Sequence, residues 1–172
     1  MPRSEKPSLD EKHPALNRSV VFLLLASAAF LYLNLILLPR TPILEGGDQV
    51  FFWMDAQHML SGERIYRDFF QFTPPGADFF YFSLFKVFGP RIWVTNAAIL
   101  FLGVALTAAC FFVAHRVMDR APAFLAASLF LTLLYCKLLN ATHHWFSMLA
   151  ILAAAFVVLG GRSPSRTAAT GA

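Results

Sequence analysis

The stretch SVVFLLLASAAFLYLNLILL (residues 19–38) decides the fold of this 172-residue chain. It carries no charge, and as a helix rising about 1.5 Å per residue it is long enough to cross a hydrocarbon core about 30 Å thick. A polar, basic leader (residues 1–18) precedes it. The apolar run is longer than the core of a cleavable signal peptide, and no small-residue cleavage site follows before Pro39, so we expect an uncleaved signal anchor.

Composition points to the same class of protein. Hydrophobic residues make up 58% of the chain and charged residues 14%, with a mean hydropathy of +0.59. Soluble domains carry about 25% charged residues, so the sequence predicts an integral membrane protein. The formal net charge is +4, but the basic residues are scattered at the ends of apolar segments and form no cluster. We therefore expect membrane lipid as a partner and no nucleic acid.

Three further apolar segments follow the first. A span is expected at residues 94–114 and ends at the charged turn 115–120. The long apolar run after it is interrupted by KLLNATHHW (residues 137–145), so we read it as two spans, 121–138 and 146–161, joined by an external turn at 139–145. The fold predicted is an all-α integral membrane protein of about four transmembrane helices, with a large external loop at residues 39–93.

The distribution of basic residues predicts the orientation. The leader, the turn 115–120 and the tail 162–172 together hold more basic than acidic residues, whereas the charges of the segments between them cancel. Because short cytoplasmic segments are enriched in Lys and Arg, we expect a cytoplasmic N-terminus in a multi-pass protein of the cytoplasmic, or inner, membrane. The loop 39–93 is then on the outer side.

The external loop contains GGDQVFFWMDAQHMLSGERIYRDFFQFTPPG (residues 46–76). Two interfacial helices are expected, at residues 50–60 and 77–88, because both are apolar but too short to cross a bilayer. Pro74 and Pro75 separate them, since neither proline donates a backbone hydrogen bond. Asp55 and His58 fall on one face of the first helix, which favours a solvated face over chemistry.

The order of motifs in this loop resembles a known family. Gly-Gly-Asp48, an aromatic helix, Arg64, the run Tyr66-Arg67-Asp68-Phe69 and then Pro-Pro-Gly76 occur in the order of the first external loop of GT-C glycosyltransferases. The subgroup it resembles comprises bacterial relatives of protein O-mannosyltransferases and of the transferases that add aminoarabinose or galacturonic acid to lipid A. The resemblance is specific over residues 46–89 and weaker through the remaining spans.

The resemblance implies transfer of a sugar from a polyisoprenyl-phosphate donor to a hydroxyl of a lipid, glycan or protein outside the cytoplasmic membrane. An acceptor hydroxyl is a poor nucleophile, so a carboxylate has to take its proton. Asp48 matches the loop acid of the family and is the candidate base. The alternative is that Asp48 caps the helix that follows it, and the two roles are compatible.

The resemblance also implies groups for the donor phosphate and for a second external site. Arg64, Arg67 and Lys137 are the candidates for binding the phosphate, with Arg67 inside the recognised motif; pairing of Arg67 with Asp68 is the structural alternative. His143 and His144 lie where related enzymes often carry an acidic residue, and a polar turn is the alternative there. Gln49 replaces the second acid that the family often has after the first, so no metal site or other cofactor is indicated, and a divalent-metal requirement is left open.

Enzymes of this subgroup are several times longer, and residues 165–172 resemble the start of their next segment. We therefore expect an N-terminal module of a longer transferase that is inactive alone. The alternative function is a non-catalytic four-span membrane protein that assists the translocation or assembly of lipid-linked sugars. The long external loop favours the transferase, because small membrane subunits generally carry their polar residues inside the spans.

Overall fold

The computed structural model of the protein describes residues 13–37, 41–44, 47–135 and 139–160. Most of the predicted leader, the candidate Lys137 and the predicted tail 162–172 lie outside these residues. The described chain is mostly helical, as its composition predicts. The elements, in chain order, are α1 (His13–Leu35), β1 (Ile36–Leu37), β2 (Thr41–Pro42), α2 (Asp48–Leu60), α3 (Gly76–Phe88), α4 (Ile92–Ala114), α5 (Arg120–Leu129), the π-helical turn η2 (Phe130–Leu134) and α6 (His143–Gly160).

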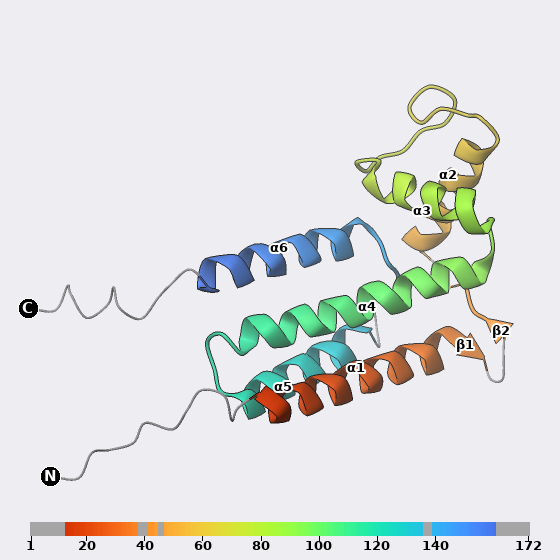
Figure 1. Ribbon diagram of the computed structural model, residues 1–172. Coiled ribbons are helices and arrows are strands. Elements are labelled where there is room, and N and C mark those ends of the chain that lie inside the picture. Colours follow the sequence, from red (N-terminus) through yellow and green to blue (C-terminus); the bar gives the residue numbers. More distant parts are fainter. Residues whose placement is uncertain (1–12, 38–40, 45–46, 136–138, 161–172) are drawn as a thin grey trace, which may run out of the picture.

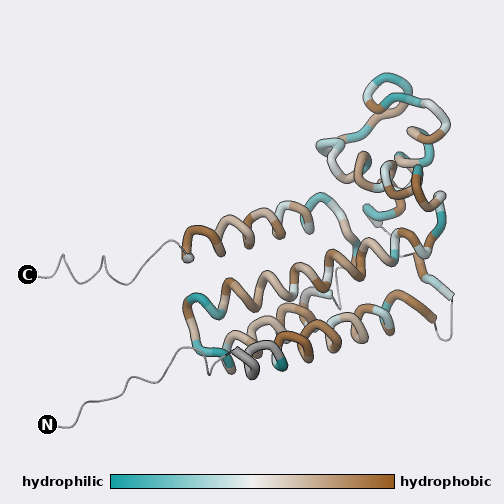
Figure 2. Tube along the Cα trace, viewed as in Figure 1, coloured by the Kyte–Doolittle hydropathy of each residue, from teal (hydrophilic) through white to brown (hydrophobic). Residues whose placement is uncertain are grey.

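Within the described residues, three helices are long and apolar enough to cross a membrane. The segments are Arg18–Leu35 in α1, all of α4, and all of α6. The fourth apolar segment, α5 with its continuation η2, is shorter. Figure 2 shows the long helices coloured mainly as hydrophobic, while hydrophilic residues gather in the loop between α2 and α3 and in the turn between α4 and α5.

These helices lie side by side with alternating direction (Figure 1). α1 and α5 begin at the end of the bundle where α4 and α6 finish, so α1 and α5 run one way and α4 and α6 the other. α4 is the central helix and packs against α1, α5 and α6. The helices α2 and α3 form a separate hairpin at the opposite end of the bundle.

The centre of the bundle is packed around Gly103 of α4. A Cβ atom at this position would lie 2.7 Å from Cδ1 of Leu31 in α1, so a larger residue would require the buried Leu31 side chain to shift. The Tyr135 hydroxyl donates a hydrogen bond to the Gly103 carbonyl at 3.1 Å, and its ring lies 4.8 Å from that of Trp145. Gly103 therefore lies at the point where α4 contacts α1, the end of η2 and α6.

The hairpin of α2 and α3 has its own apolar contacts. Phe52 and Ala56 of α2 are buried against Ala77, Tyr81 and Phe85 of α3. α3 begins immediately after Pro74 and Pro75, where the sequence predicts a break, and ends at Gly89, whose φ of +82° favours glycine. The Tyr81 hydroxyl donates to the carbonyl of Ala141 at 2.9 Å and ties the hairpin to the segment before α6.

One feature differs from the predicted all-helical fold. The first apolar helix ends at Leu35, and β1 and β2 then form a short antiparallel ribbon that pairs Ile36 with Pro42. The Leu35 carbonyl accepts hydrogen bonds from the Ile43 N–H and from the Asn96 side-chain amide, both at 2.9 Å. These bonds come from distant positions in the sequence and give the helix a defined end before the expected limit at residue 38.

Candidate functional site

The candidate base, Asp48, is the first residue of α2. Gly47 before it has φ +78°, a left-handed conformation in which glycine is unstrained, and takes the N-cap position itself. Asp48 is therefore not the cap residue that the structural alternative requires. The negative carboxylate lies in the first helical turn, where the helix dipole stabilises it. Among the described residues, no hydrogen bond or ion pair engages this half-buried side chain.

The start of α2 lies against the segment that precedes α6. A Cβ atom at Gly47 would lie 3.8 Å from the Asn140 side-chain nitrogen. One turn into α2, the Phe52 ring meets the His143 ring edge-on at 6.1 Å, and the His143 and His144 rings are 4.0 Å apart. The structure thus brings the candidate base to the same end of the bundle as the candidate second-loop histidines.

Two buried polar groups lie beside this contact. Gln49, directly after Asp48, is fully buried, and in the described part of the chain neither atom of its side-chain amide has a hydrogen-bond partner. Nδ1 of His143 is also buried and has no hydrogen-bond partner in the described part of the chain. An unsatisfied buried polar group costs about 1–3 kcal/mol, so such groups concentrate where a protein needs them for another purpose.

The candidate phosphate ligands lie elsewhere. Arg64 and Arg67 are in the loop that follows α2, a helix of 13 residues, so its length of about 18 Å separates them from Asp48. Arg67 Nε donates to Asp68 Oδ1 at 2.9 Å, and the Arg64 backbone N–H donates to Asp68 Oδ2 at 2.8 Å. The bond from Arg67 lowers the pKa of Asp68. The structure does not bring these arginines to the candidate base.

The loop is closed by its own hydrogen bonds. Tyr66 has φ +64°, which is uncommon for a residue with a side chain, and its backbone N–H donates to the Phe69 carbonyl at 2.9 Å. Its hydroxyl donates to the Thr73 carbonyl at 2.8 Å. The Tyr66-Arg67-Asp68-Phe69 motif is therefore a folded turn with its polar groups paired to each other.

A pair of carboxyl groups joins α2 to α3. The side-chain amide nitrogen of Gln71 donates to Asp55 Oδ2 at 2.7 Å and to Asp78 Oδ1 at 3.1 Å. Burial, followed by the nearby charge of Asp78, raises the pKa of Asp55 to about 6, and burial raises the pKa of Asp78. Carboxyl groups with raised pKa can hold and release a proton near neutral pH, which is a property of acid–base sites.

The sequence did not predict this carboxyl pair. Asp55 was expected on a solvated face, but it is partly buried and bonded to Gln71, whereas His58 keeps the exposed position beside Glu63, with Nδ1 3.0 Å from Oε2. Pairing depends on the packing of α2 on α3, which no local pattern reports. The one signal was an acidic residue, Asp78, at the start of an otherwise apolar helix.

No group of three or more metal-ligating side chains occurs within the described ranges. No family model matches the chain, and neither does any curated protein or solved structure. The candidate site is therefore defined by its geometry: an acid at the start of α2, the segment before α6 beside it, and a buried carboxyl pair deeper in the hairpin.

Proposed function

We propose that this chain is a membrane glycosyltransferase module that moves a sugar from a polyisoprenyl phosphate to a hydroxyl of a lipid, glycan or protein. The observation that carries the proposal is the placement of Asp48. Its carboxylate lies at the polar end of an apolar bundle, without a bonding partner in the described chain, beside the segment that contains Asn140. A carboxylate placed at a membrane surface without a structural bond is available for chemistry.

In the proposed reaction, Asp48 takes the proton of the acceptor hydroxyl while the hydroxyl oxygen bonds to the anomeric carbon of the sugar. The bond from that carbon to the phosphate oxygen breaks, and the lipid phosphate leaves with the electron pair. Cationic donors have to stabilise this leaving charge. The phosphate role of Arg64 and Arg67 stays a prediction, with Asp68 already neutralising part of the charge of Arg67.

We also propose four membrane crossings with a cytoplasmic N-terminus, the fourth made by α5 with η2. The alternating direction of α1, α4, α5 and α6 supports this arrangement (Figure 1). It places the α2–α3 hairpin on the outer side of the cytoplasmic membrane and the turn between α4 and α5 in the cytoplasm, where Arg116 and Arg120 follow the positive-inside rule. A donor carried by a membrane lipid and an acceptor from outside then meet at the hairpin.

The proposal is tested by sugar transfer in membranes. The open reading frame that contains this chain is expressed, and its membranes are given polyisoprenyl phosphates that carry radiolabelled hexose or pentose. We expect label in a lipid, glycan or protein acceptor, and at least about a 100-fold lower rate for Asp48→Asn with normal expression, because general-base catalysis contributes factors of this size.

The control is Asp119→Asn, the same change at an exposed position at the opposite end of the bundle, which should leave the rate unchanged. Sugar transfer by the Asp48→Asn variant at the rate of the unchanged protein would show that Asp48 is not the base. Absence of transfer from every donor tested would favour the alternative, a non-catalytic protein for translocation or assembly of lipid-linked sugars.

A further inference from the structure

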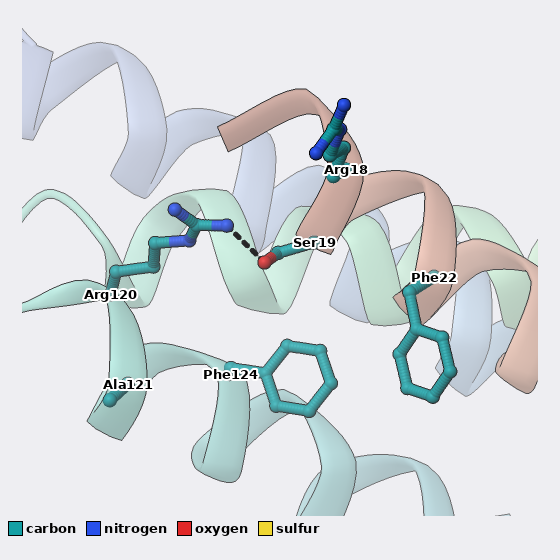
Figure 3. A pocket seen from close by; sticks show the side chains of 6 residues that line it. All are labelled: Arg18, Ser19, Phe22, Arg120, Ala121 and Phe124. Atoms are coloured by element: carbon teal, nitrogen blue, oxygen red, sulfur yellow. Dashed lines mark hydrogen bonds between the residues drawn. The ribbon is translucent and has the colours of Figure 1, made fainter. Parts of the chain in front are cut away.

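A cavity of about 530 Å³ opens between the second and third turns of α1 and the first two turns of α5. It is lined by Arg18, Ser19 and Phe22 from α1 and by Arg120, Ala121 and Phe124 from α5 (Figure 3). These turns lie at the end of the bundle opposite the α2–α3 hairpin (Figure 1). The cavity is therefore separate from the site proposed for sugar transfer.

The polar part of the cavity is strongly basic. Arg18 is exposed, and Arg120 is fixed by a hydrogen bond from its Nη2 to the Ser19 hydroxyl oxygen. Figure 3 shows the two guanidinium groups on either side of the Ser19 hydroxyl, with that of Arg120 bonded to it. Asp119, the residue before Arg120, is exposed. The first turn of α5 adds the positive end of a helix dipole, so an anion entering the cavity meets three sources of positive potential.

The opposite part of the cavity is aromatic. The Phe22 and Phe124 rings stack with centroids 6.2 Å apart and planes 26° apart, and Phe22 is 63% exposed. Each ring is four residues after an arginine on the same helix, so it lies one helical turn, about 5.4 Å, further into the bundle. The cavity thus has a cationic mouth at the end of the bundle and an apolar wall at the depth of the lipid chains.

Apolar side chains close to Phe22 and Phe124 in the sequence are also exposed. Val21 and Leu25 of α1 and Leu125 of α5 are each more than half exposed. Exposed apolar residues on a spanning helix contact lipid chains, so the cavity opens toward the bilayer. A ligand that fills it needs a negative group at the level of the lipid headgroups and a hydrocarbon chain below that group.

We propose that this cavity binds an anionic phospholipid, with its headgroup phosphate between Arg18 and Arg120 and an acyl chain along Phe22 and Phe124. Arginine forks match the geometry of phosphate oxygens, and basic pockets between membrane helices are typical sites for anionic headgroups. The orientation proposed above places the site in the cytoplasmic leaflet, the one rich in anionic lipid in many membranes. The site takes a resident lipid of the leaflet opposite the proposed sugar donor.

The test uses the full chain, purified in neutral detergent, and native mass spectrometry to count bound lipids. Phosphatidylglycerol and phosphatidylcholine with the same acyl chains are titrated separately. We expect tighter binding of phosphatidylglycerol, and about a thirty-fold loss of its affinity in the double variant Arg18→Gln with Arg120→Gln, because each basic residue near a lipid surface contributes about fivefold.

The matched control is Arg116→Gln. This arginine lies at the same end of the bundle, over the Phe156 ring at 4.3 Å, and does not line the cavity. Its loss should leave the affinity for phosphatidylglycerol unchanged. A loss equal to that of the cavity variants would show that diffuse surface charge holds the lipid and would overturn the proposal.

Two further arms keep the result interpretable. The single change Arg18→Gln alters an exposed side chain that no hydrogen bond holds in the described structure, so it tests the site even where the double variant does not fold. Titrations with inorganic phosphate and with glycerol phosphate show whether the phosphate group binds without an acyl chain. Binding of either as tightly as phosphatidylglycerol, or equal binding of phosphatidylcholine, would contradict a lipid site.

Discussion

At the scale of single residues, the two acids of α2 occupy different environments. Asp48 is half-buried at the start of the helix and has no bond in the described chain, whereas Asp55 is part of a network with Gln71 and Asp78. The first environment suits a base that exchanges protons with an acceptor. In the second environment, burial raises the pKa of both carboxyl groups, so they bind a proton at a higher pH than free carboxyl groups do.

The raised pKa of Asp55 predicts how the stability of the hairpin depends on pH. The pKa rises from 3.8 to about 6 in the folded state, so between these pH values the folded hairpin binds more protons than the unfolded one. Stability therefore falls as the pH rises through this window, and Asp78 acts in the same direction. Because Asp55 is partly exposed, we expect a loss on the order of 1–2 kcal/mol by pH 7.

Asp55→Asn tests this pH dependence, because the amide resembles the protonated acid and still accepts the Gln71 bond. Amide hydrogen exchange in α2 and α3 should show a hairpin stabilised at pH 7 and little changed at pH 4. Asp119→Asn, the same change at an exposed position at the opposite end of the bundle, should leave the pH dependence of the hairpin as it is. An Asp55→Asn variant with the same pH dependence as the parent would contradict the assignment.

Local signals gave mixed results at the residue level, since Gly47 and not Asp48 takes the N-cap position of α2. The pairing of Arg67 with Asp68 was named as an alternative because the residues are adjacent. The bond from Gln71 to Asp55 was not foreseen, since it joins two segments through the packing of α2 on α3. A sequence states which groups are acidic, but the proton affinity of each depends on neighbours that only the folded hairpin supplies.

At the scale of elements, apolar length and proline were reliable signals. The three long apolar segments are helices, and α3 begins directly after Pro74 and Pro75. The β1–β2 ribbon and the turn η2 were not predicted. Ser128 of α5 and Thr132 of η2 donate hydrogen bonds to the carbonyls four residues earlier, a bond that also competes with regular helical geometry. Such back-bonding competes weakly with the helix, so composition does not reveal it.

The close approach of α4 to α1 depends on Gly103. We expect Gly103→Leu to cost about 1–3 kcal/mol of stability, because its side chain must displace Leu31, whose Cδ1 would already lie 2.7 Å from a Cβ atom. Thermal unfolding in detergent measures the loss. Gly160→Leu is the matched control, since its Cβ would meet the flexible end of Arg116 at an ordinary 3.5 Å. Equal losses in the two variants would show that Gly103 does not set the contact.

At the scale of the whole molecule, the structure combines an apolar bundle with a polar hairpin at one end and a basic cavity at the other. This asymmetry supports both proposals, since sugar transfer at the hairpin and lipid binding in the cavity use opposite sides of one membrane. The composition predicted a membrane protein, and three helices suited to crossing a membrane agree with it. The fourth crossing depends on α5 with η2, which is shorter than the others.

The proposed topology has the α2–α3 hairpin on the outer side of the cytoplasmic membrane and four crossings of that membrane by the chain. Single cysteines at three exposed positions test it in a background without Cys110 and Cys136: Ser61 after α2, Met118 after α4, and His144 at the start of α6. A membrane-impermeant maleimide is applied to intact cells, whose outer membrane is permeabilised where there is one, and then to cells lysed as a control.

We predict labelling of Ser61→Cys and His144→Cys in intact cells, and of Met118→Cys only after lysis. Labelling of His144→Cys only after lysis would mean that α5 with η2 does not cross. Labelling of Met118→Cys in intact cells, with Ser61→Cys protected, would place the hairpin and Asp48 in the cytoplasm. That result would contradict the proposed orientation and sugar transfer on the outer side of the membrane.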